Sequence, residues 1–141
     1  MRQVALVVAV GVLAILLPAC ARASDASVKA TLLRGVAQIR QAQPGEKLTL
    51  DRQLAGTLRS LRRDRASTPA ARRGRRLAIA GFTWTRKGIR AQLDFINNDS
   101  GNIEAATRDA KRADHYLNGG ASRLRAAGRA FGLRIGRLNG R

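Results

Sequence analysis

The residue best suited to acid–base or metal chemistry in this sequence is its single histidine, His115. It stands in the run Asp114-His115-Tyr116, shortly after Asp109. A histidine near carboxylates can act as a general base or bind a metal ion. A metal site usually needs several such ligands, and after residue 23 the chain has no second histidine and no cysteine. We therefore predict that His115 lies at the boundary of a helix–helix seam and not in a catalytic or metal site.

No other part of the sequence matches a pattern with known chemistry. It has no Gly-x-Ser-x-Gly nucleophile elbow, no Walker-type phosphate loop and no dinucleotide fingerprint. The acidic residues are spread along the chain and mostly sit near arginines, as in ordinary pairing on a helix surface. Two such pairs are Glu104 with Arg108 and Asp109 with Arg112. We predict that the protein is not an enzyme and needs no cofactor or metal ion.

The first 23 residues have the order of a secretory signal. A positive start precedes an apolar run of 14 residues, Val4–Leu17, and the segment ends in small residues. Pro18 is expected to end the apolar helix, because proline lacks a backbone N–H. Ala21-Arg22-Ala23 fits the small-x-small rule for cleavage. Cleavage there would leave Ser24 as the first residue of the exported domain.

Cys20 offers a second way to process the signal. The run Leu17-Pro18-Ala19-Cys20 resembles a bacterial lipobox, in which the cysteine is lipidated and becomes the first residue. Only Pro18 departs from that pattern, at a position where a small or β-branched residue is usual. An uncleaved anchor is the third alternative, although the apolar run is shorter than the roughly 20 residues that span a bilayer. Both cleavages predict an exported protein in the periplasm, the envelope or the medium, and the second predicts a membrane tether.

The exported domain, residues 24–141, is strongly basic. Without Arg2 and Arg22 the chain keeps 25 Lys and Arg against 9 Asp and Glu, a net charge of +16. Such a field attracts polyanions, including lipid headgroups, anionic wall polymers and nucleic acid. Because 23 of the 27 basic residues are arginine, which a GC-rich genome also favours, the sign of the charge is more informative than the choice of arginine.

Two segments carry most of this charge. Residues 59–76 hold eight arginines and one acid, and residues 119–141 hold six arginines and no acid. A solvated face is the ordinary interpretation, and docking on an anionic membrane or cell-wall surface is the sharper one. The docking candidates are Arg72, Arg73, Arg75, Arg76, Arg129, Arg134 and Arg137. Two alternatives are a secreted binder of nucleic acid or acidic polysaccharide, and a cationic protein whose C-terminal helix enters membranes.

Few aromatic residues accompany these arginines. Trp84-Thr85-Arg86-Lys87 weakly resembles the mixture of aromatic and basic side chains on which single-stranded nucleic acid stacks. Aromatic residues at helical spacing are more often core residues. We therefore predict that Phe82, Trp84 and Phe95 belong to the core.

Apolar residues recur at steps of three and four through the exported domain, which predicts an all-α fold. Two helices capped by Ser24 and Thr49 are expected to form an antiparallel hairpin over residues 24–66, with its turn at Pro44-Gly45. Their apolar stripes are Val28, Leu32, Val36 and Ile39 on the first helix, and Leu50, Leu54, Leu58 and Leu61 on the second.

A second antiparallel hairpin is predicted over residues 77–118. The arginines after Thr68-Pro69 oppose a helix dipole, so we expect a basic linker there and regular helix only from Leu77. Asn118-Gly119-Gly120 is expected to end the hairpin, and a last, glycine-striped helix follows from Ser122. The predicted architecture is a small helical bundle of about four to five helices: two hairpins plus a C-terminal helix, after the signal segment.

Overall fold

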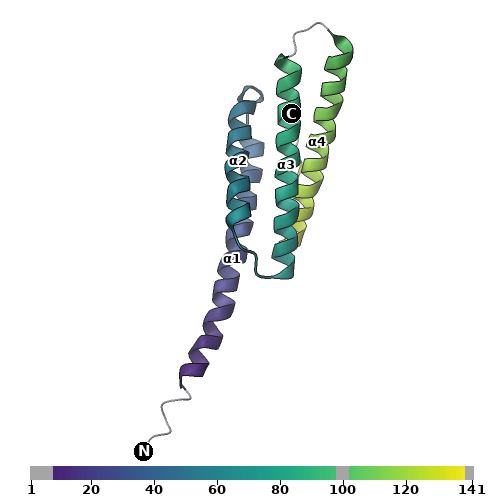
Figure 1. Cartoon of the computed structure of the whole chain (residues 1–141). Coiled ribbons are helices and arrows are strands. Elements are labelled where there is room, and N and C mark those ends of the chain that lie inside the picture. The colour runs from purple at the N-terminus through teal and green to yellow at the C-terminus, as the bar shows by residue number, and fades with distance from the viewer. Residues whose placement is uncertain (1–7, 98–101, 139–141) are drawn as a thin grey trace, which may run out of the picture.

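The structure, a computed structural model, describes residues 8–97 and 102–138, with side chains from Ser24 onward. All regular elements of these residues are helices: α1 (Val8–Gln41), the short 3-10 helix η1 (Pro44–Glu46), α2 (Lys47–Arg63), α3 (Pro69–Asn97) and α4 (Ile103–Ala130). Figure 1 shows α1 with α2 and α3 with α4 as two antiparallel hairpins, packed side by side. The predicted all-helical bundle is confirmed, with four α-helices in the described residues.

The N-terminal half of α1 projects away from the bundle (Figure 1). The helix is continuous through Pro18, where the sequence predicted its end. A proline inside a helix removes one hydrogen bond, but the alanines and leucines on both sides have high helix propensity. The side chains of the signal segment, Cys20 included, lie outside the described residues. Cleavage and lipidation therefore stay predictions, and the core described below lies entirely within residues 24–138.

The first hairpin has the predicted core. Three of the four residues in the α1 stripe are buried, the fourth, Ile39, packs against them, and all four leucines of the α2 stripe are buried. α2 begins two residues before the expected cap at Thr49, because η1 already turns the chain. The Glu46 carboxylate accepts a hydrogen bond from the backbone N–H of Gln43, at 3.2 Å, which stabilises this early start.

α3 begins at Pro69, eight residues before the start predicted from its arginines. The Thr68 hydroxyl accepts a hydrogen bond from the N–H of Ala71, at 3.2 Å, as a helix cap. The carboxylate of Asp25 on α1 accepts hydrogen bonds from the Ser67 N–H, at 2.7 Å, and from the Thr68 hydroxyl, at 2.6 Å. A negatively charged carboxylate beside the first turn of a helix interacts favourably with the helix dipole. These contacts offset the repulsion from which the sequence predicted a basic linker and regular helix only from Leu77.

α4 runs without interruption through Asn118-Gly119-Gly120, where the sequence predicted a stop. These glycines lie against α3. A Cβ atom on Gly120 would stand 2.6 Å from the Thr85 hydroxyl and 2.9 Å from the Thr85 backbone nitrogen. On α3, Gly81 and Gly88 lie equally close to leucines of α4. The glycines therefore allow two helices to approach each other closely, and they do not end one.

Residues 122–130, predicted as the start of a separate C-terminal helix, are the end of α4, and the described residues after it, 131–138, have no regular secondary structure, so the prediction of a separate helix is wrong. Gly132, with a φ of +68°, turns the chain back after Ala130. Ile135 and Leu138 are then buried in the core. Leu138 shares a cavity of about 360 Å³ with residues of both α1 and α4, so this tail covers the core between these helices. Each glycine lowers helix stability by about 1 kcal/mol, which explains why the tail packs without forming a helix.

A partly buried ion pair joins the two hairpins. The Asp51 carboxylate on α2 accepts two hydrogen bonds from Arg86 on α3, both 2.8 Å long. Arg90 adds a longer contact at 3.4 Å. The hydrogen bonds from Arg86 hold the pKa of Asp51 below its ordinary value, although burial opposes this shift. The same contact raises the pKa of Arg86.

The close approach of α3 and α4 can be tested by comparing two glycines in helix interiors. Gly120→Ala is expected to lower the free energy of unfolding by about 1–2 kcal/mol, because overpacking against backbone atoms exceeds the gain in helix propensity. Gly56→Ala on α2 is the matched control, because its Cβ would meet only the far end of Arg59, at 3.9 Å. It is expected to raise stability by up to about 1 kcal/mol. Urea unfolding measures both, and equal gains would contradict the predicted clash.

The ion pair predicts a specific pH dependence. Because the hydrogen bonds from Arg86 hold the pKa of Asp51 below its ordinary value in the folded protein, the contribution of Asp51 to stability is complete above the ordinary pKa of an aspartate, about 4, and is lost as the pH falls through the lowered pKa. Asp51→Asn is expected to show a smaller loss of unfolding free energy than the wild type over this acid range. Asp94→Asn, at an exposed position, is the control and should parallel the wild type. Equal acid losses in all three proteins would contradict the assignment.

Candidate anion-binding surface

Four chain segments meet at the end of the bundle where α1 projects from it (Figure 1). They are the start of the side-chain-packed part of α1, the α2–α3 connection, the first turns of α3 and the last turn of α4. We call this region the basal end and define it as residues 24–27, 61–76 and 125–131. Hydrogen bonds and packing contacts join all of these segments.

The start of the folded domain is hydrogen-bonded to the α2–α3 connection. The Ser24 hydroxyl donates to the carbonyl of Arg65. The Ser27 and Thr31 hydroxyls donate to the Asp64 carboxylate, at 3.2 and 3.1 Å. On the same face, partial desolvation raises the pKa of Asp25, but the hydrogen bonds from Thr68 and Ser67 together hold it below its ordinary value. Both basal carboxylates are therefore engaged by hydroxyl or backbone donors.

The basal arginines divide into two groups. Arg75 donates from Nε to the Leu61 carbonyl and from Nη2 to the Arg62 carbonyl, both at 2.6 Å, and so caps the end of α2. Arg72 donates to the carbonyl of Ser67, at 3.0 Å, and Arg125 donates to that of Ala121, at 3.4 Å. The other group is exposed, and within the described residues its side chains make no hydrogen bond or ion pair. Its members are Arg62, Arg63, Arg65, Arg73, Arg76 and Arg129.

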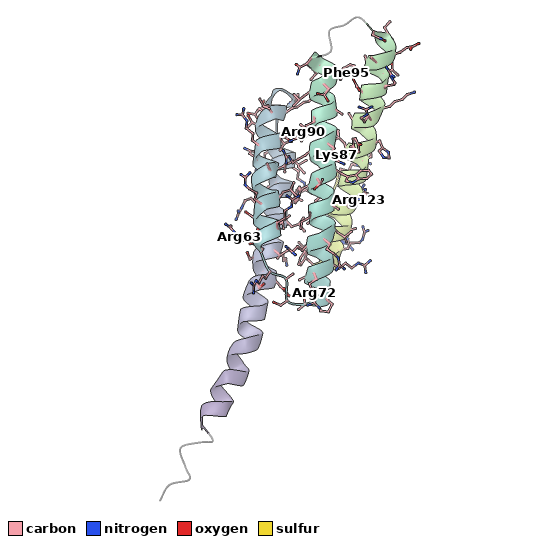
Figure 2. The ribbon with its side chains drawn as sticks, viewed as in Figure 1. Arg63, Arg72, Lys87, Arg90, Phe95 and Arg123 are labelled. Atoms are coloured by element: carbon pink, nitrogen blue, oxygen red, sulfur yellow. The ribbon has the colours of Figure 1, made fainter. Side chains whose placement is uncertain are left out.

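The structure brings five of the seven docking candidates together. Arg72, Arg73, Arg75, Arg76 and Arg129 are all at the basal end. The other two, Arg134 and Arg137, lie on the tail, which leads away from the basal end to the cavity beside the α1–α2 turn. The candidate set omitted three exposed arginines of the same basic segment: Arg62 and Arg63 in the last turn of α2, and Arg65 in the α2–α3 connection. Figure 2 labels Arg63 and Arg72 on this side of the bundle.

A groove opens at the basal end between the start of α3 and the end of α4. Its volume is about 420 Å³. Arg73 and Arg129 are its only charged lining residues, and the remainder of the lining is apolar. The apolar lining residues are Pro69, Ala70, Leu77, Ala126 and Ala130.

The opposite end of the bundle has a different character. Phe95, Ile96 and Ile103 are exposed there, at 44%, 57% and 81%, so the prediction that Phe95 belongs to the core is wrong. Figure 2 shows Phe95 near the far end of α3. The helices around it carry four basic and four acidic residues. They are Arg90, Asp94, Glu104, Arg108, Asp109, Lys111, Arg112 and Asp114. The excess positive charge is therefore concentrated away from this end.

Trp84 on α3 forms an aromatic cluster with His115 and Tyr116 on α4. The rings of His115 and Tyr116 lie 5.3 and 5.4 Å from that of Trp84, between ring centres. The Arg123 guanidinium lies 3.8 Å from the centre of the Trp84 ring, and Figure 2 places it near Lys87. Of the aromatic residues predicted for the core, Phe82 is fully buried but Trp84 is only half-buried. Because Arg123 already covers one face of Trp84, this cluster joins two helices more readily than it stacks on a base.

Comparison with protein-family models, with curated proteins and with solved structures found no match for this chain. Within the described helices, no stretch is both long and apolar enough to cross a membrane. The described residues also hold no group of three histidine, cysteine or carboxylate side chains arranged to bind a metal ion.

The two groups of basal arginines are expected to respond differently to substitution. Arg75→Ala should lower the free energy of unfolding by about 1–3 kcal/mol, because it removes charge-assisted bonds to two carbonyls at the end of a helix. Arg76→Ala removes the same charge from the next position and should change stability by less than about 0.5 kcal/mol. Thermal or urea unfolding of both variants measures the difference. Equal effects would show that Arg75 does not cap α2.

Proposed function

We propose that this protein is an exported, non-enzymatic helical bundle that binds an anionic surface of the cell envelope through its basal end. The observation that supports this most is the position of the free arginines. Six of them surround the end of the bundle at which the signal segment joins the folded domain. A surface reached through that segment would meet the arginines first.

Cys20 and the basal end of the bundle are close together along the chain. Only residues 21–23 separate Cys20 from Ser24, the first residue whose side chain is hydrogen-bonded in the bundle. Three residues extend at most about 3.6 Å each. If Cys20 carries a lipid, the basal end therefore stands within about one to two Debye lengths of the membrane. This tether is short enough for the basal arginines to reach the surface, where each basic residue contributes about 1 kcal/mol to binding of anionic lipid, a contribution that falls off within a Debye length.

The local charge balance supports the same proposal. The two basal acids, Asp25 and Asp64, are held in hydrogen bonds with α1 or the α2–α3 connection. Neither makes an ion pair with an arginine within the described residues. The six free guanidinium groups are therefore available to phosphates, to which arginine donates in a planar, bidentate geometry.

The two alternative functions have less support. Insertion of the C-terminal segment into membranes needs its apolar residues to be free, but Leu124, Ile135 and Leu138 are buried. A stacking platform for single-stranded nucleic acid needs open aromatic faces, and Arg123 covers one face of Trp84. The basal arginines alone would still attract DNA at low salt.

Vesicle binding by residues 24–141, which contain the core, tests the proposal. The protein is expected to co-sediment with vesicles that contain phosphatidylglycerol and not with neutral phosphatidylcholine vesicles, and salt should weaken binding. Substitution of Arg65, Arg73 and Arg76 by Gln is expected to lower the affinity by about tenfold or more.

A second triple variant controls for net charge. Gln in place of Arg52, Arg108 and Lys111 removes the same charge from exposed positions distant from the basal end. It is expected to lower the affinity by less than about threefold. Equal losses in the two triple variants would assign binding to overall charge, and no binding to anionic vesicles by the wild type would overturn the proposed function.

A further inference from the structure

We infer that the basal groove between α3 and α4 binds one anionic phospholipid, whose phosphate lies between Arg73 and Arg129. This inference rests on the proposed function and adds to it a specific site. The groove has about 420 Å³, and these two arginines are its only charged lining residues. Small-molecule sites in proteins have about 300–1,000 Å³ and combine an apolar lining with a few polar groups. The basal groove has both properties.

The two arginines come from different helices and are exposed. Within the described residues, neither side chain donates a hydrogen bond or contacts a carboxylate. Their neighbours Arg72 and Arg75, by contrast, are bonded to backbone carbonyls. Two free guanidinium groups on opposite walls of one groove can donate to the same phosphate from both sides.

The apolar residues of the groove favour a lipid over a free phosphate. Leu77 stands one helical turn after Arg73, and Ala126 stands one turn before Arg129, so each arginine has an apolar neighbour on its own helix. Leu77, Ala126 and Ala130 line the groove together with the arginines. A phospholipid presents the matching order of groups, since a charged phosphate is joined to glycerol and apolar acyl chains. Inorganic phosphate leaves the apolar part of the groove without a partner.

A soluble short-chain lipid separates binding in the groove from adsorption to a charged surface. The probe is dihexanoyl phosphatidylglycerol, used below its micelle concentration with residues 24–141 and followed by calorimetry and by amide shifts. The wild type is expected to bind it saturably, with the largest shifts around Arg73 and Arg129. Inorganic phosphate and glycerol phosphate are expected to bind at least about tenfold more weakly, because they bury no apolar surface. Equal binding of inorganic phosphate would overturn the assignment to a lipid.

Two pairs of substitutions test the location. Arg73→Gln with Arg129→Gln is expected to weaken binding of the short-chain lipid by about tenfold or more. Arg63→Gln with Arg65→Gln is the matched control, because it removes the same charge from exposed basal positions that do not line the groove. It should weaken binding by less than about threefold. Equal losses of affinity in the two double variants would overturn the assignment of the lipid site to the groove.

Ala126→Leu provides a test at constant charge. The larger side chain should fill part of the groove and weaken lipid binding, while binding to phosphatidylglycerol vesicles through the other basal arginines continues. The vesicle assay therefore separates the two proposals. Vesicle binding without saturable binding of the short-chain lipid would overturn the groove and leave the proposed function standing. A wild type that binds neither would overturn both.

Discussion

The scarcity of carboxylates is the constraint on which the bundle depends. The chain carries 27 basic residues and 9 acidic ones, so self-repulsion opposes a compact state. Three aspartates act at junctions between elements. Asp25 and Asp64 hold the start of α1 against the α2–α3 connection, and Asp51 holds α2 against α3 through Arg86. Because these acids are committed to junctions, most basal arginines have no carboxylate partner. Arg75 is stabilised in another way, because its guanidinium group donates to carbonyls at the end of α2 and not to a carboxylate.

The close contact between α3 and α4 depends on a different property, the absence of side chains. Gly81 and Gly88 on α3 and Gly120 on α4 allow the helices to approach until backbone and side-chain atoms of the partner helix lie near each glycine. At the basal end this approach continues to Gly74, against which the Phe131 ring packs. The walls of the basal groove are therefore set by a tightly packed hairpin. A groove on such a rigid support keeps the separation of its two arginines nearly constant.

The sequence could predict the elements that depend on local periodicity. The stripes of α1 and α2 recur at three and four residues, and the structure buries them as expected. It could not predict the start of α3, because the carboxylate that stabilises this turn belongs to Asp25, more than forty residues earlier. The same limit applies to Gly119-Gly120. A helix stop and a site of close helix approach have the same local sequence, and only the partner helix distinguishes them. The charge pattern was enough to predict the five docking candidates that cluster at the basal end. It could not predict the groove, because residues from two helices line it.

The uncompensated arginines at the basal end also lower stability, which gives a reason to connect them with binding. Like charges that are close together repel in the free protein, and an anionic surface would remove that repulsion. The charge is distributed unevenly in a way that composition alone does not explain. An arginine-rich composition without selection for binding would place free arginines at both ends, but the helices near Phe95 and Ile103 carry as many acids as bases. The net charge is denser where the signal segment enters the fold, at +7 over the 27 basal residues against +9 over the other 91 residues of 24–141. If the protein binds an anionic surface as proposed, this arrangement would place its basal end on that surface and direct its apolar end away from it.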